Sequence, residues 1–379
     1  MIKRALNLAC ALLWLPVGAA LAQDAPAEEE EESWLDKASF GMFVDSYYNL
    51  DWNMPTDPEA NSADVGHRAY VRTHGFALSF LGFEGSYTED HYGATVSLRF
   101  GPSAYPLIGF SDDQLGIDFV KQAYVSLMPT EGLTIDFGQF DTIYGAEVAD
   151  SWSNINYTRG ALYFQMQPFW HQGLRIGVAP SDMIGLTFLV VNGVNTPFKG
   201  RDPFLDEGSD DKSNVELGAQ LALTPVDMFS AYIGYYGAVL DPDGQTFSHF
   251  FDLVVNVDLK PLLIVFNADL GIADTFDSDD TNEFYGLSLA ARLALAEKWG
   301  LGLRGEYLSE ASRGGDPGID ADSLITATAT LEYLPAENLV LRLDGRLEKA
   351  TDGDIFVDSD DEATDSYFST VLGVVVKTN

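Results

Sequence analysis

The chain has 379 residues, of which 58 are Asp or Glu and 21 are Lys or Arg, so its formal net charge is −37. A chain this acidic is not expected to bind nucleic acid, because neutralising phosphates needs a basic surface. Its single cysteine excludes an intramolecular disulfide framework. Beyond the N-terminal segment, no apolar run approaches the roughly 18 residues that a membrane-spanning helix needs.

The N-terminus has the pattern of a secretory signal peptide. Lys3 and Arg4 precede an apolar run, and the small-x-small pattern ending at Ala22 is typical of a signal-peptidase site. We therefore predict a signal peptide over residues 1–22, cleaved near Ala22. Lipoprotein processing at Cys10 is the less favoured alternative, because that cut would fall in the middle of the apolar run.

An acidic segment follows the predicted cleavage site. Residues 23–37 contain a run of consecutive glutamates, Glu28 to Glu32. Like charges in such a block repel one another and favour a solvated chain. We predict that residues 23–37 form an acidic, disordered N-terminal tether. Docking to a periplasmic partner is the alternative.

From residue 38 onward the sequence alternates with a period of two. Between Leu339 and Leu347, leucines occupy most odd positions, and Arg342, Asp344 and Arg346 occupy even positions. Because a strand sends successive side chains to opposite faces, this segment has one apolar face and one charged face. The same alternation occurs in residues 215–223, 251–259 and 325–333, and more weakly in residues 287–295, where the second face is mostly small.

A soluble sandwich also alternates, but three features favour a transmembrane barrel. The strands approach the roughly 10 residues that cross a bilayer at a tilt, the polar faces carry repeated charges, and short and long connections alternate. Short turns are expected near residues 88–90, 129–131, 180–182, 225–227, 260–261, 297–298 and 335–337. Longer loops are expected near residues 50–70, 102–115, 141–170, 193–213, 238–246, 273–282, 311–321 and 350–364. These connections predict an all-β, antiparallel up-and-down barrel of about 16 strands over residues 38–379, with short periplasmic turns and long external loops.

Several segments resemble one known family of outer-membrane proteins. Asn154 to Arg159, Gln167 to Arg175, and Val190 to Gly193 are similar to segments of the putative beta-barrel porin-2 (OmpL-like) family. The segment from Gly41 to Asn49 resembles that family's opening strand. The resemblance implies an outer-membrane barrel with pore activity and an undefined solute, inserted by the barrel-assembly machinery. Many such barrels end in an aromatic residue, whereas this chain ends in Val376-Lys377-Thr378-Asn379.

The predicted loop of residues 141–170 is unusually long and rich in aromatic residues. A loop of about 30 residues is uncommon unless it is functional or disordered, and aromatic content argues against disorder. We predict that it folds into the lumen and narrows the pore; the alternative is that it packs over the mouth or against a neighbouring protomer. Its charged candidates for a constriction are Asp141, Glu147, Asp150 and Arg159.

The polar faces of the strands supply candidates for the pore wall. Alternation places six charged side chains on these faces: Arg292, Arg304, Glu306, Arg342, Asp344 and Arg346. Charged side chains that line a pore set its ion preference, although any one of them can instead form a structural ion pair in the wall. The predicted loops are strongly acidic, and a negative vestibule concentrates cations, so we predict a weak cation preference.

No pattern in the chain points to an enzyme, a cofactor or a metal centre. Nucleophilic catalysis needs a base beside the nucleophile, but the five histidines are scattered and there is no Gly-x-Ser-x-Gly motif. The acidic stretch from Asp277 to Asp280 lacks the layout of an EF-hand loop. We expect solvated acidic loops there, with bridging by divalent ions as the alternative.

Together these features predict a porin of the bacterial outer membrane. Its expected partners are outer-membrane lipid and small hydrophilic solutes or cations that diffuse passively, and a homotrimer is the oligomer suggested by analogy. One alternative is a sugar-specific channel, for which Trp52, Tyr144, Trp152 and Trp170 are candidates for an aromatic track. The other is a structural or adhesive barrel without transport.

Overall fold

The computed structural model describes residues 33–57, 61, 74–104, 119–192, 215–238, 248–274, 281–309 and 321–378. The predicted signal peptide and most of the predicted tether lie outside these residues. The last part of that tether forms a short 3-10 helix, η2 (Trp34–Lys37), which leads into the first strand. Ser33 caps η2: its hydroxyl accepts a hydrogen bond from Leu35, and its backbone N–H donates to Asp36.

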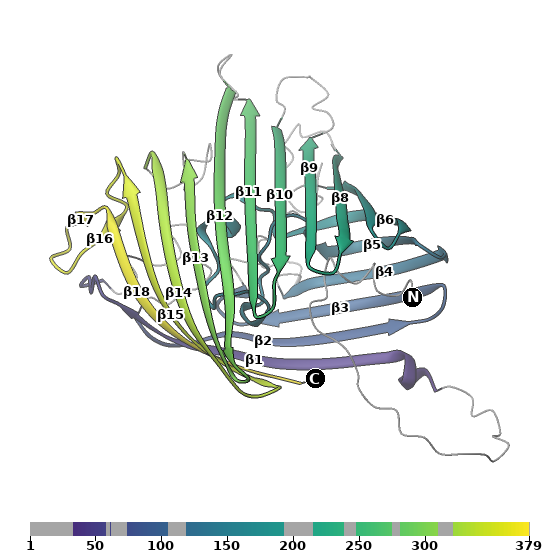
Figure 1. The fold of residues 1–379 in the computed structure, drawn as a ribbon, viewed down its shortest axis with the longest axis horizontal. Coiled ribbons are helices and arrows are strands. Elements are labelled where there is room, and N and C mark those ends of the chain that lie inside the picture. The colour runs from purple at the N-terminus through teal and green to yellow at the C-terminus, as the bar shows by residue number, and fades with distance from the viewer. Residues whose placement is uncertain are drawn as a thin grey trace, which may run out of the picture.

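Sixteen antiparallel strands of the described chain close into a barrel, as predicted. Each strand pairs with its neighbours in the chain, and β1 pairs with β18 to close the ring, so that purple β1 lies beside yellow β18 in Figure 1. The strands are β1 (Ala38–Asp51), β2 (Gly75–Thr88), β3 (Tyr92–Phe100), β4 (Val120–Thr130), β5 (Leu133–Asp141), β6 (Trp170–Ser181), β7 (Ile184–Val191), β8 (Glu216–Val226), β9 (Phe229–Ala238), β10 (Ser248–Asp258), β11 (Leu262–Asp274), β12 (Thr281–Ala296), β13 (Trp299–Ser309), β14 (Ser323–Ala336), β15 (Leu339–Thr351) and β18 (Ser366–Lys377).

The barrel is apolar outside and polar inside, the reverse of a water-soluble domain. In β15, Leu343 and Leu347 are 43% and 50% exposed on the outer surface, whereas Asp344 and Arg346 between them are buried on the inside. An outer wall of exposed leucines is stable only where lipid covers it. The predicted alternation of faces in residues 339–347 is therefore confirmed.

Short turns join the strands at one end of the barrel. Four of the predicted ranges begin two residues too early, because Pro129, Pro180, Pro225 and Pro335 lie inside β4, β6, β8 and β14, although the last residue of each range lies in the turn. At each of these prolines the register of the strand pair shifts. Proline lacks an N–H donor, so a strand tolerates it near its end or at a bulge, where a ladder bond is absent.

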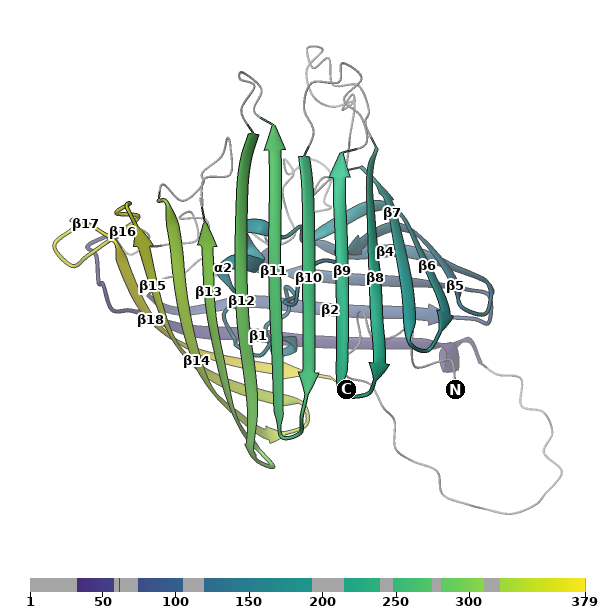
Figure 2. The same ribbon diagram turned by 45° about the horizontal axis from the view of Figure 1, so that its top comes forward.

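The interval between β5 and β6 is the longest fully described connection. It comprises residues 142–169 and contains a 3-10 turn, η4 (Ser151–Ser153), and a short helix, α2 (Ala161–Met166). Figure 2 shows α2 behind β12, and its side chains pack on the inner face of that strand. In the described part of the chain, no helix is long and apolar enough to cross a membrane.

A small hairpin lies between β15 and β18. It consists of β16 (Phe356–Val357) and β17 (Ala363–Thr364). The Phe356 side chain is fully buried and stacks on Tyr367 of β18, with the ring centroids 5.6 Å apart. The same apolar cluster includes Leu162 of α2, so the hairpin packs against the loop of residues 142–169.

Candidate functional site

The loop of residues 142–169, called the inner loop below, lies inside the barrel. The backbone N–H of Gly145 donates to Asp252 of β10 at 3.2 Å, and that of Ala146 donates to Asn267 of β11 at 3.0 Å. Further along, the Thr158 hydroxyl donates to Asp344 of β15 at 2.9 Å. These acceptors point inward from different parts of the ring, so the loop crosses the lumen.

Glycines in the wall form sockets for the side chains of the inner loop. A Cβ added at Gly234 would lie 2.6 Å from the Tyr144 ring, and one added at Gly373 would overlap the Tyr157 ring. At Gly286 an added Cβ would overlap Leu162 and Met166 of α2. Because real Cβ atoms do not approach other atoms this closely, any larger residue at these positions would displace the loop. The wall is therefore shaped for this loop.

Arg304 of β13 anchors the centre of the inner loop. Its Nη1 donates to the Glu147 carboxylate at 2.6 Å and to the Thr158 carbonyl at 2.7 Å. Glu306, two residues along the same strand, accepts the first backbone N–H groups of α2 from Ala161 at 3.1 Å and Leu162 at 3.2 Å. A carboxylate at this position satisfies donors that have no partner within the helix.

A second anchor comes from β15. Arg342 donates to the Ser151 carbonyl at 2.6 Å and forms an ion pair with Glu332 at 2.8 Å. Asp344 accepts two hydrogen bonds from Thr158, and Arg346 donates to the carbonyl of Arg159. Each buried charge of β15 named here thus meets a group of opposite polarity, as its burial requires.

A third anchor lies across the lumen, on β3 and β4. Arg99 donates to both carboxylate oxygens of Asp150 at 2.9 Å, and Lys121 lies 3.3 Å from the same carboxylate. Lys121 also binds Asp141 at 2.5 Å. Burial alone would raise the pKa of Asp150, a loop residue, but the Arg99 and Lys121 cations hold that pKa well below its ordinary value. Asp150 therefore stays ionised and keeps the loop attached.

Most of the six charges predicted to line the pore lie beneath the inner loop rather than in open water. Glu306, Arg342, Asp344 and Arg346 face inward, as the alternation predicts, but the loop buries them. Arg292 is half-buried and borders the cavity described below, as does Arg304. Of the four loop candidates, Asp141, Glu147 and Asp150 border the same cavity, whereas Arg159 is buried against Phe80 and donates to the Ala149 carbonyl.

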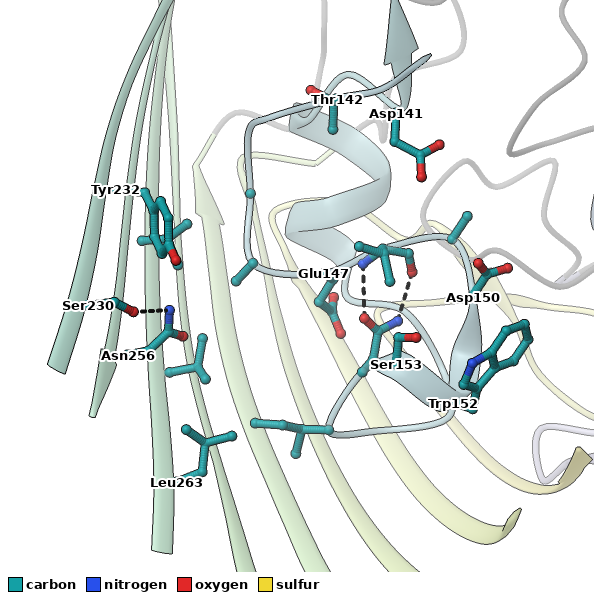
Figure 3. Close-up of a pocket in the computed structure, with 18 of the residues that line it drawn as sticks. Asp141, Thr142, Glu147, Asp150, Trp152, Ser153, Ser230, Tyr232, Asn256 and Leu263 are labelled. Carbon is teal, nitrogen blue, oxygen red and sulfur yellow. Dashed lines mark hydrogen bonds between the residues drawn. The ribbon is translucent and has the colours of Figure 1, made fainter. Parts of the chain in front are cut away.

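A cavity of about 1490 Å³ lies between the inner loop and the wall and reaches residues of the short turns. In Figure 3, Ser230, Tyr232 and Asn256 stand on the wall, across the open space from Glu147 of the loop. Asn256 donates to the Ser230 hydroxyl at 3.1 Å, so this part of the wall offers neutral polar groups. Toward the short turns the lining adds charges of both signs: Asp182, Asp227, Asp258, Lys260 and Lys377.

Comparison with known families identifies the barrel. The model of one family, described as Putative beta-barrel porin-2, OmpL-like, matches residues 37–377. The chain belongs to this porin family. The match covers every strand from β1 to β18 and confirms the predicted resemblance, so the protein is an outer-membrane β-barrel channel. No curated protein matches the chain.

Solved porin structures share the fold at low sequence identity. The chain is similar to an anion-selective porin from Comamonas acidovorans, with 11% identity, a TM-score of 0.61, and coverage of 90% of this chain and 99% of that one. It is also similar to OmpT of Vibrio cholerae in its trimer form, with 14% identity, a TM-score of 0.56 and 90% and 99% coverage. OmpF of Salmonella typhi, in complex with daunomycin, matches with 14% identity, a TM-score of 0.55 and 92% and 100% coverage.

The other residues that hold the inner loop carry no sequence pattern that marks them. Asp45 of β1 accepts hydrogen bonds from Ser151 and Tyr157 of the loop, both at 2.7 Å. On β11, Asn267 accepts from Ala146 and from Gln167. Alternation alone places Asp45 and Asn267 on an inner face, but nothing in the sequence links them to a loop about 100 residues away.

Proposed function

We propose that this porin lets small hydrophilic solutes and ions diffuse passively through the cavity beside the inner loop. The observation that carries this proposal is the cavity of about 1490 Å³ inside a closed barrel, bordered by neutral and charged polar groups and reaching the short turns. Purified protein in a planar bilayer is expected to give discrete conductance steps. A bilayer that stays silent when the barrel is folded and inserted would contradict the proposal.

The inner loop is proposed to set the width of the pathway. In support, it is fastened to β1, β3, β10, β11, β13 and β15, and it faces the cavity with Glu147, Ser153 and Trp152. A loop held on so many sides keeps its position against a solute stream. Its removal is the first experiment described in the Discussion.

The proposed ion preference is weakly cationic. Among the charged side chains that border the cavity, acids outnumber bases, and the net charge of the whole chain is −37. Negative potential raises the local concentration of cations and lowers that of anions. In a salt gradient across a planar bilayer, the reversal potential is expected to have the sign of cation selectivity. The opposite sign, which would match the name of the Comamonas porin, would refute this preference.

A sugar-type channel is the second candidate function. Of the four aromatic residues considered for a sliding track, Trp152 and Tyr144 border the cavity, although the Tyr144 side chain is almost fully buried. Trp170 is buried in an apolar cluster with residues of the inner loop, and the exposed Trp52 is not among the residues that border the cavity. Tyr232, on the wall at the other side of the loop, also borders the cavity (Figure 3). Liposome swelling with sugars of graded size separates the readings: a smooth size cutoff indicates general diffusion, and one anomalously fast sugar indicates specificity.

We further propose that the protein assembles as a homotrimer. The support is the similarity to OmpT of Vibrio cholerae in its trimer form. Chemical crosslinking in native membranes followed by mass determination is expected to give a species of three protomers. If crosslinking gives only monomers, the proposed trimer is contradicted, whereas the proposed channel function is not affected.

A further inference from the structure

Two aspartates of the inner wall stand directly opposite one another. Asp252 of β10 and Asp269 of β11 are register partners in adjacent antiparallel strands, and each is only 3% exposed. Side chains in such a pair point to the same face of the sheet, with Cβ atoms about 5 Å apart. Two like charges at this separation, out of contact with bulk water, destabilise one another unless something lies between them.

The pair has no basic partner, unlike several other buried carboxylates of the wall. Arginine lies within ion-pair distance of Asp136, Glu306, Glu332 and Glu348. Among the residues that the structure describes, no lysine, arginine or histidine forms an ion pair with Asp252 or Asp269. No basic side chain among these residues therefore offsets the like charges of the pair.

Neutral donors reach most of the carboxylate oxygens but leave one without a partner. The Asn267 amide donates to Oδ1 of both aspartates at 3.0 Å, and Gln167 donates to Oδ2 of Asp269 at 2.8 Å. Oδ2 of Asp252 is buried and accepts no hydrogen bond, and Oε1 of Gln167, in a side chain only 2% exposed, is also buried without a donor. A buried acceptor without a donor costs about 1–3 kcal/mol.

We propose that Asp252 and Asp269 bind one divalent cation of the calcium type, with the amide oxygens of Asn267 and Gln167 as further ligands. All four side chains carry oxygen donors, the ligand type that calcium takes. Rotating the Gln167 amide by half a turn exchanges its nitrogen and its oxygen in nearly the same volume and turns the unpartnered Oε1 toward Asp269 and Asn267. Asn267 keeps its orientation, so its Oδ1 still accepts from Ala146. The described residues contain no cluster of three acidic, histidine or cysteine ligands, so the amides are needed to complete this site.

The proposed ion would fasten both ends of the inner loop. Gly145, near the start of the loop, donates to Asp252, and the Gln167 amide, near its end, lies within hydrogen-bond distance of Asp269 and Asn267, where its oxygen would reach the ion. Gly145, Ala146 and Asn267 also border the cavity, which gives the ion a route from water. The cation would thus control how firmly the loop is held. This consequence for conductance rests on the proposed narrowing role of the loop, whereas the binding itself does not.

Terbium luminescence tests the binding directly. The ring of Tyr144 and the Cβ of Asp252 both approach the same position above Gly234, which places a tyrosine sensitiser beside the pair. Detergent-solubilised full-length protein, stripped with a chelator, is titrated with Tb³⁺ near neutral pH. We expect saturable tyrosine-sensitised emission that Ca²⁺ displaces and that is lost in Asp252→Asn and in Asp269→Asn.

Matched controls separate binding at the pair from binding of Tb³⁺ to surface carboxylates and from loss of emission through misfolding. The substitutions Asp360→Asn and Glu362→Gln lie in the exposed β16–β17 hairpin and are expected to keep the saturable emission. Asn has the shape of Asp and still offers an oxygen to Gly145, so the variants are expected to fold, as judged by heat-modifiable mobility in gels. Emission that survives in both folded aspartate variants, or that Ca²⁺ does not displace, would overturn the site and leave a shared proton as the bridge.

Conductance gives a second, separable result. Chelation is expected to increase the single-channel conductance of the wild type and to make its current fluctuate. The conductance of Asp252→Asn is expected to stay unchanged on chelation. If Ca²⁺ binds but chelation does not alter the wild-type steps, the link between the ion and the loop is refuted while the binding site stands. A complete absence of steps in every variant would instead contradict the proposed channel function.

Discussion

Two arcs of the inner wall share one sequence pattern and have opposite surroundings. In the charged arc, β13 to β15, inward side chains such as Arg304, Arg342 and Asp344 lie under the inner loop. In the cavity arc, the halves of β9 to β12 nearest the short turns, Ser230 and Asn256 face open space. Alternation therefore determines which way a residue points, but the inner loop determines whether it meets water.

The two arcs also differ in how their polar groups are satisfied. Burying an arginine or a carboxylate is costly unless opposite charges and hydrogen bonds replace the lost water. The inner loop supplies these groups to the charged arc through backbone carbonyls, backbone N–H groups and Glu147. The cavity arc needs no such partners, because water reaches it. The charges that a sequence assigns to a pore wall can thus serve to hold a loop.

Deleting the inner loop is expected to have the largest effect on the difference between the charged arc and the cavity arc. Removing residues 145–165 would open the charged arc to water, so the single-channel conductance in a planar bilayer is expected to rise several-fold. Shortening the exposed hairpin at residues 358–362 is the control and should leave the conductance close to that of the wild type. An unchanged conductance in the folded deletion variant would defeat the proposal that the loop narrows the pore.

Arg304→Met removes the basic group that Glu147 and Glu306 share. Leaving buried carboxylates without their cation is expected to lower the free energy of unfolding by about 3–5 kcal/mol. Urea unfolding of the barrel in lipid vesicles, followed by tryptophan fluorescence, measures the change. A loss below about 1 kcal/mol would show that the pair behaves like an exposed salt bridge.

Filling a glycine socket is expected to shift the loop without removing it. Gly234→Val places methyl groups where the Tyr144 ring lies, so the conductance should rise, but by less than in the deletion variant. The matched control is Gly305→Val, because a Cβ at Gly305 meets nothing within 4 Å. Equal conductance in the two variants would mean that the socket does not position the loop.

Removing one hydroxyl from each arc gives the smallest expected effects. In the charged arc, Thr330 is fully buried, donates to Asp344 at 2.7 Å and accepts from Asn156 at 2.7 Å. Thr330→Val is therefore expected to lower the free energy of unfolding by about 1–3 kcal/mol. Ser288→Ala, at the cavity, should change it by less than about 0.5 kcal/mol. Equal losses in urea unfolding would contradict the distinction between the arcs.

Strand number and the facing of side chains are predictable from this sequence because both depend on local periodicity. Residues 339–347 show this well: every predicted inward charge is inward in β15. The turns at Pro129 and Pro335 are placed too early because a bulge lets the strand continue through the proline. Local patterns do not reveal such bulges.

The path of the inner loop could not be predicted, because its contacts depend on closure of the ring. Tyr157 and Asp45 are far apart in the sequence and meet only when β1 pairs with β18. The opposition of Asp252 and Asp269 is closer to prediction, since one hairpin carries both residues. To predict that Asp252 and Asp269 are opposite one another, the pairing of β10 with β11 must be known to the exact residue. The predicted turn at residues 260–261 does not define that pairing.

The glycine sockets have a consequence for engineering. A segment grafted into this barrel in place of residues 142–169 would present different side chains to Gly234, Gly286 and Gly373. These hollows would then remain empty, and an empty apolar hollow weakens packing. To exchange such a loop between two barrels, the wall residues that contact the loop therefore have to be changed together with the loop itself.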